Sequence, residues 1–270
     1  MKLGLIEAVW AGSPLEGRPG AELAKEIGFD SIDLVTDPLD LDGPQLSQAV
    51  SGVEAVGLPV SATVCVALGI ADFNRSVQRF HVERAKRHLD FAAAVGASNM
   101  LLVIGDYLWK KEVIPPDEQW ETAVTNVREV AMHAESVGLL VALELEPYEW
   151  AYVNSVDEMV RFLDAVGAEA MMANADLAHL WPMKIGPGEL NKLAGRIAHA
   201  HISDCDGVVY ENLPPGRGTA PLAAYYGALE NTGFDGTIAV ELEPPPDGVD
   251  VVEWVREGYE RTRQLMDGTR

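Results

Sequence analysis

Apolar and polar residues follow two alternating patterns along the chain. Short apolar runs, typical of strands buried on both faces, are separated by longer segments in which apolar residues recur every three or four positions, typical of amphipathic helices. The predicted strands cover residues 3–7, 31–35, 60–66, 99–104, 139–146, 170–175, 196–202 and 237–242. The predicted helices cover residues 20–27, 43–56, 73–95, 116–138, 155–166 (with Ser155 as cap), 187–194, 220–232 and 250–266.

Eight strand–helix units follow one another at roughly 30-residue spacing, without a linker between them. Strands that alternate with helices imply a parallel sheet, and eight units imply a closed barrel rather than an open sheet. The 270 residues also match the length of one such barrel, about 250 residues. We therefore predict an α/β fold in which residues 1–270 form a single (β/α)₈ TIM barrel. Its active site is expected at the C-terminal ends of the strands.

Polar residues interrupt the apolar pattern near the ends of four consecutive predicted strands. In the strand at 139–146, Glu144 and Glu146 alternate with leucines and point to one face. Because both faces of a barrel strand are usually buried, carboxylates there are costly unless they bind something positive. The same feature recurs at three later positions: Asp176 with His179, His201 with Asp204, and Glu241 with Glu243.

Counting with a period of two places these side chains on the inner face of the barrel. The inward sets are Glu144 and Glu146, then Asn174 and Asp176, then Ile197, His199 and His201, and finally Ala239, Glu241 and Glu243. In each set the acidic or imidazole group comes late in its strand, at the expected mouth of the site. The sequence therefore predicts one metal site built from four strand ends.

Composition narrows the class of protein. The formal charge of −22 argues against nucleic acid and against anionic membranes, because binding to either depends on Lys and Arg. No apolar run approaches the ~20 residues of a membrane helix, and the start lacks the apolar region of a signal peptide. The two cysteines suggest neither a disulfide framework nor a zinc knuckle. A soluble, cytoplasmic enzyme is expected.

Four short motifs carry a family resemblance. They are Val-Ala-Leu-Glu at 141–144, Asn-Ala-Asp-Leu-Ala-His at 174–179, His-Ile-Ser-Asp at 201–204 and Ile-Ala-Val-Glu at 238–241, and Pro-Gly-Arg-Gly at 215–218 accompanies them. In this order and spacing they resemble the sugar phosphate isomerase/epimerase family of the xylose isomerase-like TIM barrel superfamily. The resemblance spans most of the chain.

The resemblance implies one divalent metal ion bound by Glu144, Asp176, His201 and Glu241. It also implies that His179 and Arg217 contact substrate oxygens, while Asp204 orients or contacts groups near His201. Three carboxylates and one imidazole form a hard ligand set that suits Mn²⁺ or Mg²⁺, with Co²⁺ possible.

Such a site suggests an isomerase or epimerase of a small ketose or related polyol. A metal-polarised carbonyl favours an enediolate, and Glu144 and Glu241, on separated strands, are the expected acid–base pair. One alternative is a metal-dependent dehydratase of an inosose or dehydroshikimate type of substrate, which shares the first half-reaction. A second alternative is a non-catalytic sugar-binding or subunit-type barrel.

Several assignments stay open at this point. Glu146 could replace Glu144 as the ligand, and otherwise it is expected to line the substrate pocket. His199, one layer below His201, is expected to be a satisfied or supporting buried histidine rather than a ligand. Trp109 and Trp181 follow strands and could stack on a sugar, although ordinary loop packing is the alternative.

The expected partners follow from the same motifs. Abasic-site endonucleases of this superfamily carry histidines after strands three and four, whereas residues 64–67 and 103–106 contain none. The absence of these histidines is a second argument, beside the negative charge, against a nucleic-acid partner. A small sugar or polyol is the expected partner, together with a homo-oligomer, a dimer or tetramer, for which the loop at 105–115 could be an interface or a lid.

Overall fold

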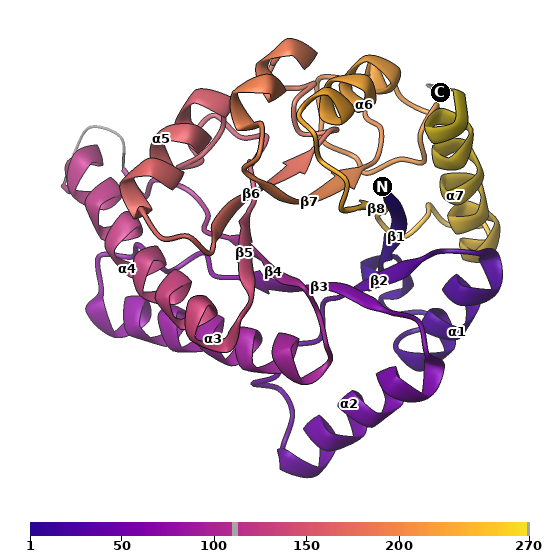
Figure 1. Cartoon of the computed structure of the whole chain (residues 1–270), viewed down its shortest axis with the longest axis horizontal. Coiled ribbons are helices and arrows are strands. Elements are labelled where there is room, and N and C mark those ends of the chain that lie inside the picture. Colours follow the sequence, from indigo (N-terminus) through magenta and orange to yellow (C-terminus); the bar gives the residue numbers. More distant parts are fainter. Residues whose placement is uncertain (110–112, 269–270) are drawn as a thin grey trace.

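Eight parallel strands close into one barrel, as predicted (Figure 1). The computed structural model describes residues 1–109 and 113–268, so residues 110–112 of the 105–115 loop lie outside the described part. Each strand pairs with the next, and the last pairs with the first. The strands are β1 (Lys2–Ile6), β2 (Ser31–Leu34), β3 (Val60–Val66), β4 (Asn99–Val103), β5 (Leu140–Leu143), β6 (Met171–Asp176), β7 (Ile197–Ile202) and β8 (Thr237–Val240).

Helices form the outer ring around this barrel (Figure 1). They are α1 (Arg18–Ile27), α2 (Gly43–Val56), α3 (Arg75–Ala94), α4 (Pro116–Val137), α5 (Val156–Val166), α6 (Leu222–Asn231) and α7 (Val251–Gly268). Ser155 caps α5 as predicted, accepting a hydrogen bond from the backbone N–H of Glu158 at 3.2 Å. None of the described helices is long and apolar enough to cross a membrane.

One predicted helix has a different form. The segment between β6 and β7 is a 3₁₀ helix, η2 (Pro187–Leu193), and a second one, η1 (Glu7–Trp10), follows β1. Segment η2 is short and begins with Pro187 and Gly188, and glycine is a poor helix former. This part of the outer ring is therefore a more tightly wound element with nearly the predicted bounds.

The register of the strands places the polar residues at one level of the barrel. Between β6 and β7, Asp176 pairs with His201. Strands β5 and β8 end at Leu143 and Val240, so Glu144 and Glu241 are the first residues after each strand. Their backbone N–H groups still donate to the neighbouring strands, to Leu102 O at 3.0 Å and to Ile202 O at 3.1 Å. The ladder therefore continues for one residue and holds both carboxylates at the C-terminal mouth.

Candidate metal centre

Five acidic and imidazole side chains converge at the C-terminal mouth of the barrel. They form two overlapping groups, Glu144 with Asp176 and His179, and Asp176 with His201 and Glu241; within each group the ligand atoms lie within 4.8 Å of one another. His201 Nδ1 is 2.7 Å from Glu241 Oε2 and 4.0 Å from Glu144 Oε2. Four of the five are almost fully buried, and Glu241 is 21% exposed. The four predicted ligands are therefore brought together by four different strands.

Each of the two most buried carboxylates is fixed by one of its oxygens. Glu144 Oε2 accepts a hydrogen bond from the side-chain amide of Asn174 at 2.7 Å. Asp176 Oδ1 accepts two, from the backbone N–H groups of Ala178 at 2.7 Å and His179 at 3.1 Å. Both side chains are thus oriented by the chain itself, with the second oxygen of each left for another partner.

Those second atoms have no hydrogen-bond partner among the described residues. The ring of His179 is also oriented by the backbone, since its Nδ1 lies 2.5 Å from the carbonyl oxygen of Leu145. Because this oxygen can only accept, Nδ1 is the donor and Nε2 is left for another partner. The buried atoms without a hydrogen bond include Glu144 Oε1, Asp176 Oδ2 and His179 Nε2, while His201 Nδ1 lies against the carboxylate of Glu241. Buried polar atoms are rarely left unsatisfied, so three such atoms in one cluster require a partner. A divalent cation fits this cluster, because all of these atoms are lone-pair donors when deprotonated.

The pKa shifts within the cluster also favour a bound cation. Burial raises the pKa of Glu144 well above its usual value, and Asp176 and Glu241 raise it further. Burial likewise raises the pKa of Asp176, against the effect of His179. Burial opposes ionisation of Glu241 too, but His201 lowers the pKa of this carboxyl to about 2. Burial lowers the pKa of His201, but Glu241 and Asp33 outweigh this and raise it well above its usual value. Without a cation, the cluster therefore retains protons that a bound metal would displace.

Comparison with known proteins agrees with this architecture. The model of the xylose isomerase-like TIM barrel family matches residues 21–265. The chain belongs to this family. The D-psicose 3-epimerase of Ruminiclostridium cellulolyticum is 27% identical over 253 residues, which cover 89% of this chain and 83% of that protein.

Two solved structures share the fold over nearly their whole length. The IolI protein with a bound zinc atom has a TM-score of 0.86 at 20% identity and covers 100% of this chain and 99% of its own. The D-allulose 3-epimerase from Methylomonas sp., in complex with D-allulose, has a TM-score of 0.82 at 18% identity and covers 98% and 97%. These likenesses show the barrel fold, and the sequence relative is a sugar epimerase.

Within this family site, Glu144 is better placed than Glu146 to bind a metal. Glu144 belongs to a group of converging ligand atoms, whereas Glu146, two residues later, does not. Glu146 lies closer to the rim and is only half-buried. Burial nevertheless raises its pKa, and the nearby His179 opposes that rise. Glu146 therefore lies beside the cluster, where lining the substrate pocket stays its predicted role.

We expect Glu144→Gln and Glu146→Gln to separate these roles. Loss of the Glu144 carboxylate should weaken Mn²⁺ binding by more than the roughly 10- to 100-fold that loss of a supporting partner costs a metal site. Glu146→Gln should leave the affinity within a few-fold of the unmutated protein. Competition with a fluorescent chelator measures both, and a larger loss in Glu146→Gln would exchange the two assignments.

The structure places Asp204 away from the converging atoms. Its carboxylate accepts three backbone hydrogen bonds, from Cys205 at 2.9 Å, Gly216 at 2.8 Å and Ala220 at 3.0 Å. A Cβ atom at Gly218 would lie 2.3 Å from Asp204 Oδ1, so the loop closes tightly around this carboxylate. These contacts indicate a structural role in the loop after β7, and the predicted contact of Asp204 with groups near His201 or with substrate stays a prediction.

Arg217 also lies outside the cluster. Its guanidinium pairs with the carboxylate of Glu257 at 2.8 Å and stacks over the ring of Trp254 at 4.6 Å. The side chain is 46% exposed. A contact with substrate oxygens stays a prediction that requires this side chain to leave Glu257.

The two tryptophans flank different loops. Trp181 donates a hydrogen bond from Nε1 to Thr219 Oγ1 at 3.0 Å and packs beside Lys184. The Trp109 ring lies 5.8 Å from that of Phe73, a side chain that is 64% exposed. Both have the loop packing that was the alternative to sugar stacking, and their substrate contacts stay predictions.

Tyr210 is a site residue that the sequence pattern did not reveal. Its ring packs edge-to-face against the ring of His179, with centroids 4.3 Å apart. Burial, together with the charges of Glu241, Asp176 and Glu144, raises the pKa of its hydroxyl well above the usual value. The hydroxyl therefore stays a hydrogen-bond donor next to the cluster. Because Tyr210 lies in an irregular loop, no periodicity pointed it inward.

Proposed function

We propose that this protein is a divalent-metal-dependent epimerase or isomerase of a small ketose or related polyol. The observation that carries the proposal is the convergence of buried atoms of Glu144, Asp176, His179 and His201 with the carboxylate of Glu241 at the C-terminal mouth, where barrels of this kind place their active sites. All of these residues come from one chain, so the proposed metal ligands need no contribution from a partner. The expected dimer or tetramer stays a prediction.

The metal would be held by Glu144, Asp176, His201 and Glu241, and when bound it would act as a Lewis acid on a substrate carbonyl. Glu144 and Glu241 follow strands β5 and β8, three strands apart around the ring, and reach the cluster from different sides. One carboxylate would remove the proton from the carbon beside the carbonyl. The other would return a proton, to the opposite face of that carbon in an epimerase or to the neighbouring carbon in an isomerase.

The surroundings of the two carboxyl groups suit such a pair. Glu241 Oε2 lies 2.7 Å from His201 Nδ1, whereas Glu144 Oε2 accepts a hydrogen bond from Asn174 at 2.7 Å, so each carboxyl group is held by a different neighbour. His179, whose Nε2 faces the cluster, would donate to or accept from a substrate hydroxyl.

The sequence relatives support epimerisation as the more specific reaction. Besides the D-psicose 3-epimerase, the fructoselysine 3-epimerase of Escherichia coli O157:H7 is 25% identical over 169 residues, covering 62% of this chain and 60% of that protein. Both relatives are named for inversion at carbon 3 of a ketose or ketose derivative. We therefore place a ketose 3-epimerase ahead of the isomerase. No contact in the described site favours the dehydratase, and a non-catalytic barrel would have no need for the unsatisfied ligand atoms.

Solvent labelling tests the proposal. The Mn²⁺-loaded protein is incubated in D₂O with free ketohexoses and ketopentoses, and the products are followed by mass spectrometry and proton NMR. An epimerase should yield an isomeric ketose with deuterium at the inverted carbon. A dehydratase, offered inososes or dehydroshikimate, would instead give a conjugated product with ultraviolet absorbance. Absence of exchange with every substrate would reject both reactions.

A further inference from the structure

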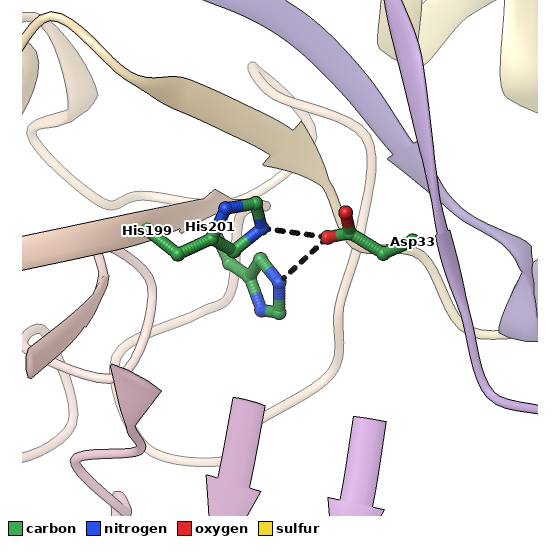
Figure 2. Close-up of side chains that lie close together, drawn as sticks. All are labelled: Asp33, His199 and His201. Atoms are coloured by element: carbon green, nitrogen blue, oxygen red, sulfur yellow. Dashed lines mark hydrogen bonds and ion pairs between the residues drawn. The ribbon is translucent and has the colours of Figure 1, made fainter. Parts of the chain in front are cut away.

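A buried carboxylate behind the metal centre links two histidines of one strand. Asp33 lies on β2, three strands from β7 around the ring, and is fully buried. Figure 2 shows that one carboxylate oxygen, Oδ2, faces both imidazoles, at 2.7 Å from His199 Nε2 and 3.3 Å from His201 Nε2. The other oxygen accepts a hydrogen bond from Ser61 Oγ at 2.6 Å.

This arrangement determines which ring nitrogen carries a proton. A carboxylate only accepts, and Oδ2 of Asp33 lies within hydrogen-bond distance of the Nε2 atoms of both rings. The Nε2 atom of each ring must therefore carry the hydrogen. For His201 this leaves Nδ1 as the nitrogen that faces Glu241 and Glu144. A histidine binds a metal through its deprotonated nitrogen, and Nδ1 is on the side of the cluster.

We propose that Asp33 is a positioning residue that holds His201 in the Nε2–H tautomer and aims its Nδ1 at the metal. This inference rests on the proposed metal-dependent function. Metal-binding histidines commonly donate their other ring N–H to a carboxylate, which fixes the ring and increases its basicity as a ligand. Here the carboxylate comes from a strand that supplies none of the expected ligands.

His199 completes the arrangement. Its ring lies 5.1 Å from that of His201, nearly perpendicular to it, and its Nε2 makes the shorter of the two bonds to Asp33. Together with Ser61 it fixes the carboxylate from two sides, so Asp33 cannot rotate away from His201. The three groups could in principle hold a second metal ion, since their ligand atoms lie within 4.8 Å of one another. Their mutual hydrogen bonds argue against this, because Oδ2 and both Nε2 atoms are already used.

The change Asp33→Asn tests the proposal. The amide is a weaker acceptor and can turn its NH₂ group toward the rings, which favours the wrong tautomer. We expect the dissociation constant for Mn²⁺, measured by chelator competition, to rise roughly 10- to 100-fold. In the Zn²⁺-loaded unmutated protein, ¹⁵N NMR of the histidines should show His201 protonated at Nε2 and coordinated through Nδ1.

Asp37→Asn is the matched control. Asp37 also neighbours a buried histidine, with Oδ1 3.3 Å from His88 Nε2, but it belongs to neither group of the metal centre. Its Mn²⁺ affinity should stay within about threefold of the unmutated protein, which separates tautomer control from the general cost of altering a buried Asp–His pair.

Three outcomes would overturn the inference. A folded Asp33→Asn protein with unchanged Mn²⁺ affinity would remove the positioning role while leaving the proposed function intact. If this variant does not fold, the NMR measurement on the unmutated protein decides, since coordination of His201 through Nε2 excludes the role. Failure of the unmutated protein to bind Mn²⁺ or Zn²⁺ would reject the proposed function, and this inference with it.

Discussion

Glu241→Gln is expected to lower kcat/KM for the ketose substrate by about 10²- to 10⁴-fold, the usual contribution of a general acid or base. The change removes a carboxylate that contacts His201 Nδ1 at 2.7 Å and belongs to the converging ligand atoms. It therefore affects proton transfer and metal binding together. At saturating Mn²⁺, steady-state kinetics reduce the effect of a weaker metal affinity. The loss of kcat/KM that remains therefore measures the effect on proton transfer.

Glu243→Gln provides the control for this experiment. Counting with a period of two predicted that Glu243 points inward, but the structure places it on the surface, because β8 ends at Val240 and alternation is lost beyond it. Activity of this variant should match that of the unmutated protein. Equal losses of activity in Glu241→Gln and Glu243→Gln would refute the assignment of Glu241. A general effect of removing one negative charge from the acidic barrel would then explain both losses.

The barrel and the convergence of the four expected ligands were predictable because local rules determine both. Strand–helix alternation fixes the parallel closed sheet, and a period of two then fixes which side chains face inward. The inward direction of Asp176 and His201 was predictable because both lie within strands, in register with each other. That of Glu144 and Glu241 was predictable because the backbone ladder continues one residue past each strand. At Glu243, two residues further along, alternation no longer holds and the side chain is exposed.

The supporting groups could not be predicted, because they depend on contacts between distant segments. In the sequence Asp33 is only one residue of a predicted strand, and its bond to His199 joins residues 166 positions apart. Tyr210 lies in a loop, whose path follows no periodicity. Arg217 is the opposite case, a residue that a motif indicated but that packing places elsewhere. Its ion pair with Glu257 holds the side chain outside the cluster. Motifs thus identified residue types that suit the chemistry, and packing determined which of them face the site.

Removal of the metal should abolish activity, and addition of Mn²⁺ or Mg²⁺ to the chelated protein should restore it. The ligands converge only in the folded chain, so binding of the cation should also stabilise the fold. At a metal concentration one hundred times the dissociation constant, the gain is about 2.7 kcal/mol. For a chain of this size that corresponds to an increase in Tm of roughly 5–10 °C, which differential scanning calorimetry can measure.

Metal binding should also depend on pH, with a sign set by the protons that the cluster retains. The pKa values of Glu144, Asp176 and His201 are raised, so in the metal-free protein these groups hold protons at pH values where exposed groups of the same type would have lost them. Because a cation must displace these protons, its affinity should fall as the pH is lowered. Calorimetric titrations in buffers of different ionisation enthalpy should detect proton release on binding. Full turnover in chelated protein, or a metal affinity that rises on acidification, would contradict the site described here.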